Sequence, residues 1–268
     1  QHFVVDYYVQ YHLAFHHLTA CPILVRLAGQ AIRLPCRVAT TPAHAMLLQI
    51  PELLNSAQVA KIHEIIAEGT FVDGRLSAGM AASRVKQNQE LAQDASLLQR
   101  LYRVIMASVG HNETFRSAAL PAKVADFIFA RYLPGMRYGD HVDDPIMGQG
   151  PRFRSDVSMT IFLNPPDSYD GGELEIRTPF GDQQVKLAAG HAVVYPSASV
   201  HRVAEVTRGE RLVALTWIQS YVRDAAQREL LYELDQSRQQ LLRRDAQSDV
   251  TKNIDRAYVN LLRMWAEV

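Results

Sequence analysis

Hydrophobic residues recur at helical spacing in two segments of the first half of the chain. The pattern predicts a helix over residues 56–68, in which Asn55 or Ser56 caps the start and Gly69 follows the end. A second helix is expected over residues 89–109, and the intervening segment 71–79 is expected to be turn and loop. The apolar faces of the two helices comprise Val59, Ile62, Ile65 and Ile66, and Leu91, Leu98, Leu101 and Ile105.

From Val124 the pattern changes to short runs rich in β-branched and aromatic residues, separated by Gly, Pro, Asn and Asp. The runs are DFIFARYL, VSMTIFL, ELEIR, QQVKL, HAVVYP and RLVALTWIQSY. Consecutive short strands with turn residues between them are typical of a β-sandwich or jelly roll, and not of alternating βα units. The predicted fold class is therefore α+β, with a jelly-roll core.

After Tyr221 the period becomes helical again, with Leu230, Leu234 and Leu241 at four- and seven-residue steps and a last helix through AYVNLLRMWAEV. These patterns predict four regions. They are an N-terminal extension (1–45), a helical support region (46–123), a β-core (124–221) and C-terminal helices (222–268). The C-terminal helices are also where we expect two copies to pair as a homodimer.

Residues 1–45 show neither a helical nor a strand period, although they contain five of the ten histidines and both cysteines. One interpretation is that Met46, which opens a cleaner pattern, is the natural start. The alternative is a metal site, but the spacing of the candidate ligands matches no zinc pattern. Those candidates are His12, His16, His17, Cys21 and Cys36.

Composition places the chain among ordinary globular proteins, with 48% hydrophobic and 21% charged residues over its full length. The formal net charge is zero, so no overall field attracts nucleic acid or an anionic membrane. No apolar run approaches the roughly 18 residues of a membrane-spanning helix, and the N-terminus lacks the basic start of a signal peptide. We therefore expect no nucleic-acid or membrane partner, and a cytoplasmic location.

The strand RYLPGMRYGDHVDD carries the candidate chemistry, because it ends in His141 and Asp143. Residues two apart on an extended chain point to the same side, so an imidazole and a carboxylate can bind one cation. With a second imidazole they would form the two-His-one-carboxylate triad of non-haem iron(II) oxygenases, which leaves other coordination positions open. Asp140 and Asp144 are neighbouring alternatives that we interpret as solvated or turn residues.

The third ligand must come from His191, His201 or His111. If the site also binds 2-oxoglutarate, it needs a cation for the distal carboxylate, and the planar guanidinium of arginine suits this role. Arg211 follows His201 by ten residues, whereas the tenth residue after His191 is His201 itself. Two antiparallel strands joined by TRGE would bring residues 201 and 211 to one barrel mouth. This choice gives His141, Asp143 and His201 as metal ligands and Arg211 as the co-substrate anchor.

The sequence at these residues resembles the PKHD-type hydroxylases, bacterial relatives of the prolyl 4-hydroxylase catalytic domain. The resemblance runs from about Met46 to the C-terminus. One departure is Gly190-His191, where relatives usually have Gly-Asp. The matching stretches are FVDGRLSAG, VKQNQEL, RYLPGMRYGDHVDDP, SMTIFLNPPDSYDGGELEI, VVYPSASVHRV, TRGERLVALTWIQS and NLLRMWAE.

The resemblance implies a double-stranded β-helix core flanked by helices. It also implies Fe(2+) bound by His141, Asp143 and His201, 2-oxoglutarate bound by Arg211, dioxygen as oxidant and L-ascorbate as accessory reductant. Tyr132, Tyr138 and Tyr195 are read as packing residues near the site, with a hydrogen bond to 2-oxoglutarate as the alternative. Peptidyl proline, an amino acid and a siderophore-related molecule are all compatible primary substrates.

Two other functions are compatible with parts of the pattern. The first is a non-catalytic metal-binding β-barrel that senses or binds a ligand, although a sensor has no need of Arg211. The second is an interaction protein that acts through residues 222–268, although an inert barrel has no need of the triad.

Overall fold

The computed structural model describes residues 23–27, 30–34, 46–80, 82–148, 150–178 and 180–268. The chain forms two compact units, Gln1–Pro42 and Ala43–Val268. In the first unit, β1 (Ile23–Leu27) and β2 (Gln30–Leu34) pair in antiparallel fashion, a hairpin that the sequence pattern did not predict. The histidines and cysteines of the alternative metal site lie outside the described residues.

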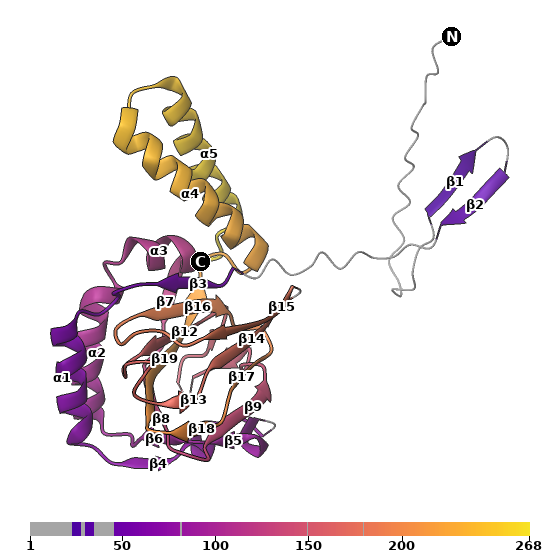
Figure 1. The fold of residues 1–268 in the computed structure, drawn as a ribbon. Coiled ribbons are helices and arrows are strands. Elements are labelled where there is room, and N and C mark those ends of the chain that lie inside the picture. The colour runs from indigo at the N-terminus through magenta and orange to yellow at the C-terminus, as the bar shows by residue number, and fades with distance from the viewer. Residues whose placement is uncertain (1–22, 28–29, 35–45, 81, 149, 179) are drawn as a thin grey trace, which may run out of the picture. The chain divides into compact units, whose positions relative to one another are not determined.

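The second unit is built on two antiparallel sheets (Figure 1). Among the described residues, the larger sheet has the order β3-β16-β12-β19-β8-β6-β4, with β7 also paired to β19. Its strands are β3 (Leu48–Ile50), β4 (Phe71–Asp73), β6 (Gln89–Leu91), β7 (Pro121–Val124), β8 (Ile128–Tyr132), β12 (Val157–Phe162), β16 (Ala192–Pro196) and β19 (Arg211–Ser220).

The smaller sheet has the order β15-β14-β17-β9-β5, and two short pairs, β10–β11 and β13–β18, lie outside both sheets. Together the sheets form the jelly-roll, or double-stranded β-helix, core that the sequence predicted. The remaining strands are β5 (Lys86–Gln87), β9 (Arg137–His141), β10 (Ile146–Met147), β11 (Phe153–Arg154), β13 (Asp170–Gly171), β14 (Leu174–Thr178), β15 (Gly181–Val185), β17 (His201–Val203) and β18 (Val206–Arg208).

Strand β12 shows how the larger sheet is buried on both faces, since all six of its residues are buried. Side chains alternate between faces along a strand. Met159 and Ile161 therefore pack in the cluster shared with the helices, while Phe162 packs in the cluster between the sheets. Strand β19 alternates in the same way, with Leu212 on the helix side and Val213 inside the barrel. This parity directs the side chains of Ser158 and Arg211 into the barrel.

Helices α1 (Ser56–Ala67) and α2 (Ala95–Val109) cover the outer face of the larger sheet (Figure 1). Asn55, one of the two residues expected to cap α1, does so in a reciprocal capping box with Gln58. The start predicted for the second helix at residue 89 is wrong. Gln89–Leu91 pairs with strands on both sides, and the helix begins only where Asp94 caps it. The two short 3-10 helices are η1 (Gly74–Ser77) and η2 (Ala82–Arg84).

The chain ends in two helices, α4 (Ala225–Asp245) and α5 (Asp249–Trp265), which lie side by side as a hairpin (Figure 1). The hairpin packs on α3 (Glu113–Ala119) and the following residues through Leu120, Val222, Leu231 and Tyr258. The apolar face differs slightly from the predicted one, because Leu231 is buried while Leu230 is 56% exposed.

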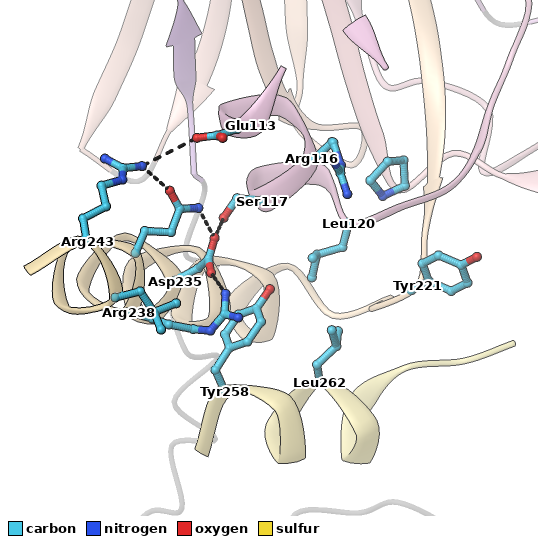
Figure 2. A pocket seen from close by; sticks show the side chains of 13 residues that line it. Glu113, Arg116, Ser117, Leu120, Tyr221, Asp235, Arg238, Arg243, Tyr258 and Leu262 are labelled. Atoms are coloured by element: carbon cyan, nitrogen blue, oxygen red, sulfur yellow. Dashed lines mark hydrogen bonds and ion pairs between the residues drawn. The ribbon is translucent and has the colours of Figure 1, made fainter. Parts of the chain in front are cut away.

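A pocket of about 670 Å³ lies between α3 and this hairpin (Figure 2). Its buried carboxylate, Asp235, accepts hydrogen bonds from Ser117 Oγ at 2.7 Å, Arg238 Nη1 at 2.8 Å and Gln239 Nε2 at 2.7 Å. The bond from Ser117 joins the hairpin to α3, whereas Arg238 and Gln239 belong to α4 itself and complete the hydrogen bonding of the carboxylate. None of the residues that the sequence nominated for catalysis lines this pocket.

Candidate active site

Two histidines from different strands lie side by side inside the smaller sheet. Strands β9 and β17 pair in antiparallel fashion with His201 directly opposite His141, and the two ring centroids are 4.2 Å apart. Asp143 follows two residues after His141, and its Oδ1 lies 3.8 Å from His201 Nε2. One ligand atom from each of the three residues lies within 4.8 Å of the other two, so a single ion can contact all three.

Backbone carbonyls orient both imidazoles for metal binding. His141 Nδ1 lies 2.8 Å from the carbonyl oxygen of Gly139, and His201 Nδ1 lies 3.0 Å from that of Ser199. A carbonyl oxygen can only accept, so each Nδ1 carries the proton and donates it. The unprotonated Nε2 of each ring is then available as a ligand, an arrangement that metal-binding histidines commonly use.

A hydroxyl pair fixes the carboxylate of Asp143. Ser158 Oγ donates to Asp143 Oδ2 at 2.5 Å and lies 2.8 Å from Ser197 Oγ. This leaves Oδ1 directed toward His201. Ser158 was not predicted from the amino-acid sequence, although a polar residue at an inward position of the largely apolar strand VSMTIFL was a usable signal.

Burial keeps His141 in the protonation state that a metal ligand requires. Desolvation, followed by the nearby His201, lowers the pKa of His141 to about 4, so its imidazole is neutral near pH 7. The Tyr138 ring stacks on His141 at a centroid distance of 3.6 Å, and Tyr195 meets His201 edge-on at 5.2 Å. Burial raises the pKa of both phenols. These two tyrosines therefore pack directly against the imidazoles.

Arg211 opens β19 and lies opposite Tyr132 of β8. Its side chain is 2% exposed, and no hydrogen bond or ion pair joins its guanidinium to another described residue. The guanidinium carbon instead lies 5.0 Å from the centroid of the Tyr132 ring and 5.6 Å from that of Phe162. The turn at Gly172 makes room for this side chain, because a Cβ there would lie 2.9 Å from Arg211 Cδ.

The rival candidates lie apart from this cluster. The Asp140 carboxylate is exposed and pairs with Arg177 at 3.0 Å, and Asp144 is also exposed. His191 belongs to the turn before β16, where its backbone N–H donates to Ala188 O. His111 is an exposed residue just beyond the end of α2. The structure thus brings together His141, Asp143 and His201 and separates the four alternatives from them.

Comparison with known proteins also indicates a 2-oxoglutarate- and iron(II)-dependent oxygenase. Residues 127–219 match the model of the 2OG-Fe(II) oxygenase superfamily, and residues 225–267 match the PKHD-type hydroxylase C-terminal domain. A PKHD-type hydroxylase of Thioalkalivibrio sulfidiphilus is 53% identical over 224 residues, and one of Caulobacter vibrioides is 45% identical over 229 residues. Each alignment covers 83% of this chain and the whole of the relative.

Among solved structures, a prolyl-4-hydroxylase of Pseudomonas putida is 23% identical, with a TM-score of 0.42 over 67% of this chain and 94% of the other. The assignment rests on the sequence relatives and not on this likeness. The protein is a 2-oxoglutarate-dependent dioxygenase, an oxidoreductase whose superfamily implies Fe(2+) and 2-oxoglutarate. Within that class, the chain belongs to the PKHD-type hydroxylase family.

Proposed function

We propose that this protein hydroxylates its substrate with Fe(2+) bound by His141, Asp143 and His201, and with 2-oxoglutarate anchored by Arg211 and converted to succinate and CO2. The observation that carries the proposal is that Arg211 is buried and has no ion pair with a described residue. A buried cation without a counter-ion is costly. A ligand carboxylate at this position would neutralise it.

The donor set fits iron(II). Two neutral imidazole nitrogens and one carboxylate oxygen match the facial triad of non-haem iron oxygenases, and a carboxylate fills the position that a halide would need. The bound metal would supply the activation of dioxygen. The protein groups do the rest: the Gly139 and Ser199 carbonyls hold the imidazoles as Nε2 ligands, and Ser158 fixes the carboxylate.

Arg211 would orient the co-substrate. Its guanidinium lies over the rings of Tyr132 and Phe162, and its N–H groups have no hydrogen-bond partner among the described residues and can pair with a carboxylate. The keto-acid end of 2-oxoglutarate would then face the triad. The apolar side chains between the two sheets exclude bulk water from this site.

Three further features belong to the proposal. L-ascorbate serves as accessory reductant, by analogy with the superfamily. The regions 1–45, 46–123, 124–221 and 222–268 act as extension, helical support, catalytic core and C-terminal helices. Residues 222–268 join two copies in a homodimer, which the exposure of Leu230, Val250 and Met264 supports.

The charge balance argues against nucleic acid as a partner. Within the described residues, no helix combines the length and apolarity needed to cross a bilayer.

The decisive experiment is an anaerobic titration of the Fe(2+)-loaded protein with 2-oxoglutarate, followed by the weak visible charge-transfer band of the keto acid on iron. We expect a band in the wild type and a large loss of affinity in Arg211→Ala. Arg208→Ala is the matched control, because Arg208 is an exposed arginine three residues away, paired with Asp170. Folded, iron-loaded wild type that gives no band would refute the proposal.

Catalysis is tested by succinate release under air. Wild type should release succinate, and Asp143→Ala should not, while retaining its fold. Succinate release by Asp143→Ala at the wild-type rate would refute the assignment of the triad.

A further inference from the structure

Asn88 is a buried polar residue to which the proposed function gives no role. It lies between β5 and β6, where one extended segment passes from the smaller sheet to the larger. Lys86 pairs with Tyr138 in the smaller sheet, and Gln89 pairs with Arg131 in the larger. Asn88 therefore sits where the two sheets meet at the edge of the barrel.

The segment presents three buried polar side chains at alternating positions, Lys86, Asn88 and Glu90. Lys86 Nζ donates to Glu90 Oε1 at 2.5 Å and to Ser77 Oγ at 3.0 Å, so the two charges neutralise each other. Asn88 is 5% exposed, and neither Oδ1 nor Nδ2 completes a hydrogen bond with a described residue. Buried amide groups without partners are rare and call for an explanation.

The packing on one side of Asn88 is tight. The backbone N–H of Gly74 donates to the Asn88 carbonyl at 3.0 Å, and a Cβ at residue 74 would lie 1.9 Å from Asn88 Oδ1. Gly74, the first residue of η1, thus packs directly against the Asn88 side-chain amide. The β6–β8 register pairs Glu90 with Ala130 and Gln89 with Arg131, so the next residues along the two strands, Asn88 and Tyr132, lie opposite each other.

Tyr132 connects Asn88 to the cation of the site. The Tyr132 ring lies against the Arg211 guanidinium. Burial raises the pKa of Tyr132 to about 12, while the charge of Arg211 and the approach of Asn88 act in the opposite direction. An amide N–H can only donate, so in a hydrogen bond from Asn88 Nδ2 the Tyr132 oxygen would accept and the phenol hydrogen would be free to point elsewhere.

We propose that Asn88 is a positioning residue for 2-oxoglutarate. When 2-oxoglutarate binds, the Asn88 Nδ2–H donates to Tyr132 Oη, which directs the Tyr132 hydroxyl hydrogen at the distal carboxylate held by Arg211. The carboxylate thus receives a neutral donor in addition to the guanidinium. This inference rests on the proposed function, since it assigns Asn88 to the same co-substrate site.

The test measures the affinity for two keto acids, 2-oxoglutarate and pyruvate, by the anaerobic charge-transfer titration of the Fe(2+)-loaded protein. Pyruvate has the chelating end of 2-oxoglutarate but lacks the distal carboxylate. Asn88→Ala should weaken 2-oxoglutarate about tenfold, the effect of losing one hydrogen bond, and should leave pyruvate unchanged. Gln87→Ala, the exposed neighbour on the same segment, should change neither affinity.

Two further variants distinguish positioning from packing. Asn88→Asp keeps the shape but replaces the donor with an anion, so it should weaken 2-oxoglutarate more than Asn88→Ala does. Tyr132→Phe should match Asn88→Ala, and the double variant should be no weaker than Tyr132→Phe, because both residues act through one hydroxyl. If Asn88→Ala does not fold, Asn88→Ser takes its place with the same expected loss.

The inference is overturned if Asn88→Ala weakens both keto acids equally, if the two single effects add in the double variant, or if Asn88→Asp binds 2-oxoglutarate like wild type. These results differ from those expected if the proposed function is wrong. If the proposed function is wrong, the wild type itself gives no band with 2-oxoglutarate, and the role of Asn88 is refuted together with the proposed function.

Discussion

Replacing Arg211 by methionine should separate stability from ligand binding. Methionine keeps a flexible, unbranched aliphatic stem but lacks the guanidinium and its charge. The wild-type side chain is 2% exposed and has no ion pair with a described residue, so the substitution removes an uncompensated buried cation. The substitution also removes two cation–π contacts, with Tyr132 and Phe162, each contributing about 0.5–2 kcal/mol to stability. This loss offsets the gain from removing the buried charge. We therefore expect the free energy of unfolding of the unliganded protein to change by no more than about 1 kcal/mol.

The liganded protein should behave differently. At a 2-oxoglutarate concentration of about 100 Kd, binding stabilises the wild type by roughly 2.7 kcal/mol. Losing the charge pair costs about 2–5 kcal/mol of binding. At the lower end of that range, the affinity falls about 30-fold, so the same concentration becomes about three Kd and the stabilisation falls to about 0.9 kcal/mol. The ligand effect in Arg211→Met should thus fall to about a third of its wild-type value or less.

The assay is anaerobic urea denaturation with Mn(2+) in place of iron, with and without 2-oxoglutarate. Arg208→Met is the control, and it should retain the full ligand stabilisation. Arg211→Met that remains stabilised by 2-oxoglutarate as strongly as the wild type would refute the anchor. An unliganded Arg211→Met destabilised by several kcal/mol would show instead that the guanidinium holds the fold together.

Other substitutions test the core, the metal site and the hairpin. Leu101→Ala removes a fully buried side chain of α2 and should cost about 2–5 kcal/mol of unfolding free energy in urea, whereas Leu76→Ala, at an exposed position, should cost less than about 0.5 kcal/mol. Ser158→Ala frees the Asp143 carboxylate and should weaken Mn(2+) binding about 10–100-fold in a calorimetric titration; unchanged affinity would argue against this role. Asp235→Ala removes the acceptor of three hydrogen bonds and should lower the free energy of unfolding in urea by about 1–3 kcal/mol. The Mn(2+) affinity should be unchanged. A parallel loss of metal binding would contradict the separation of the hairpin from the metal site.

Features that depend on local period could be predicted from the amino-acid sequence alone. The helical spacing of isoleucines identified α1 and its cap, and the short β-branched runs identified the jelly roll. The two-residue spacing of His141 and Asp143 placed both on one side of the chain. The placement of Arg211 at the start of a strand followed from the turn TRGE.

The tertiary structure decided what depends on strand register and on contacts distant in sequence. Gln89–Leu91 has a helical pattern of leucines with α2, yet it forms β6 because strands lie ready to pair on both of its sides. The pairing of His201 with His141 depends on the register of β17 and β9, and the contact of Ser158 with Asp143 joins two separate strands. Local period tells which side of its own strand a side chain takes. Only the packed sheets fix which strands become neighbours, and therefore which polar groups meet inside the barrel.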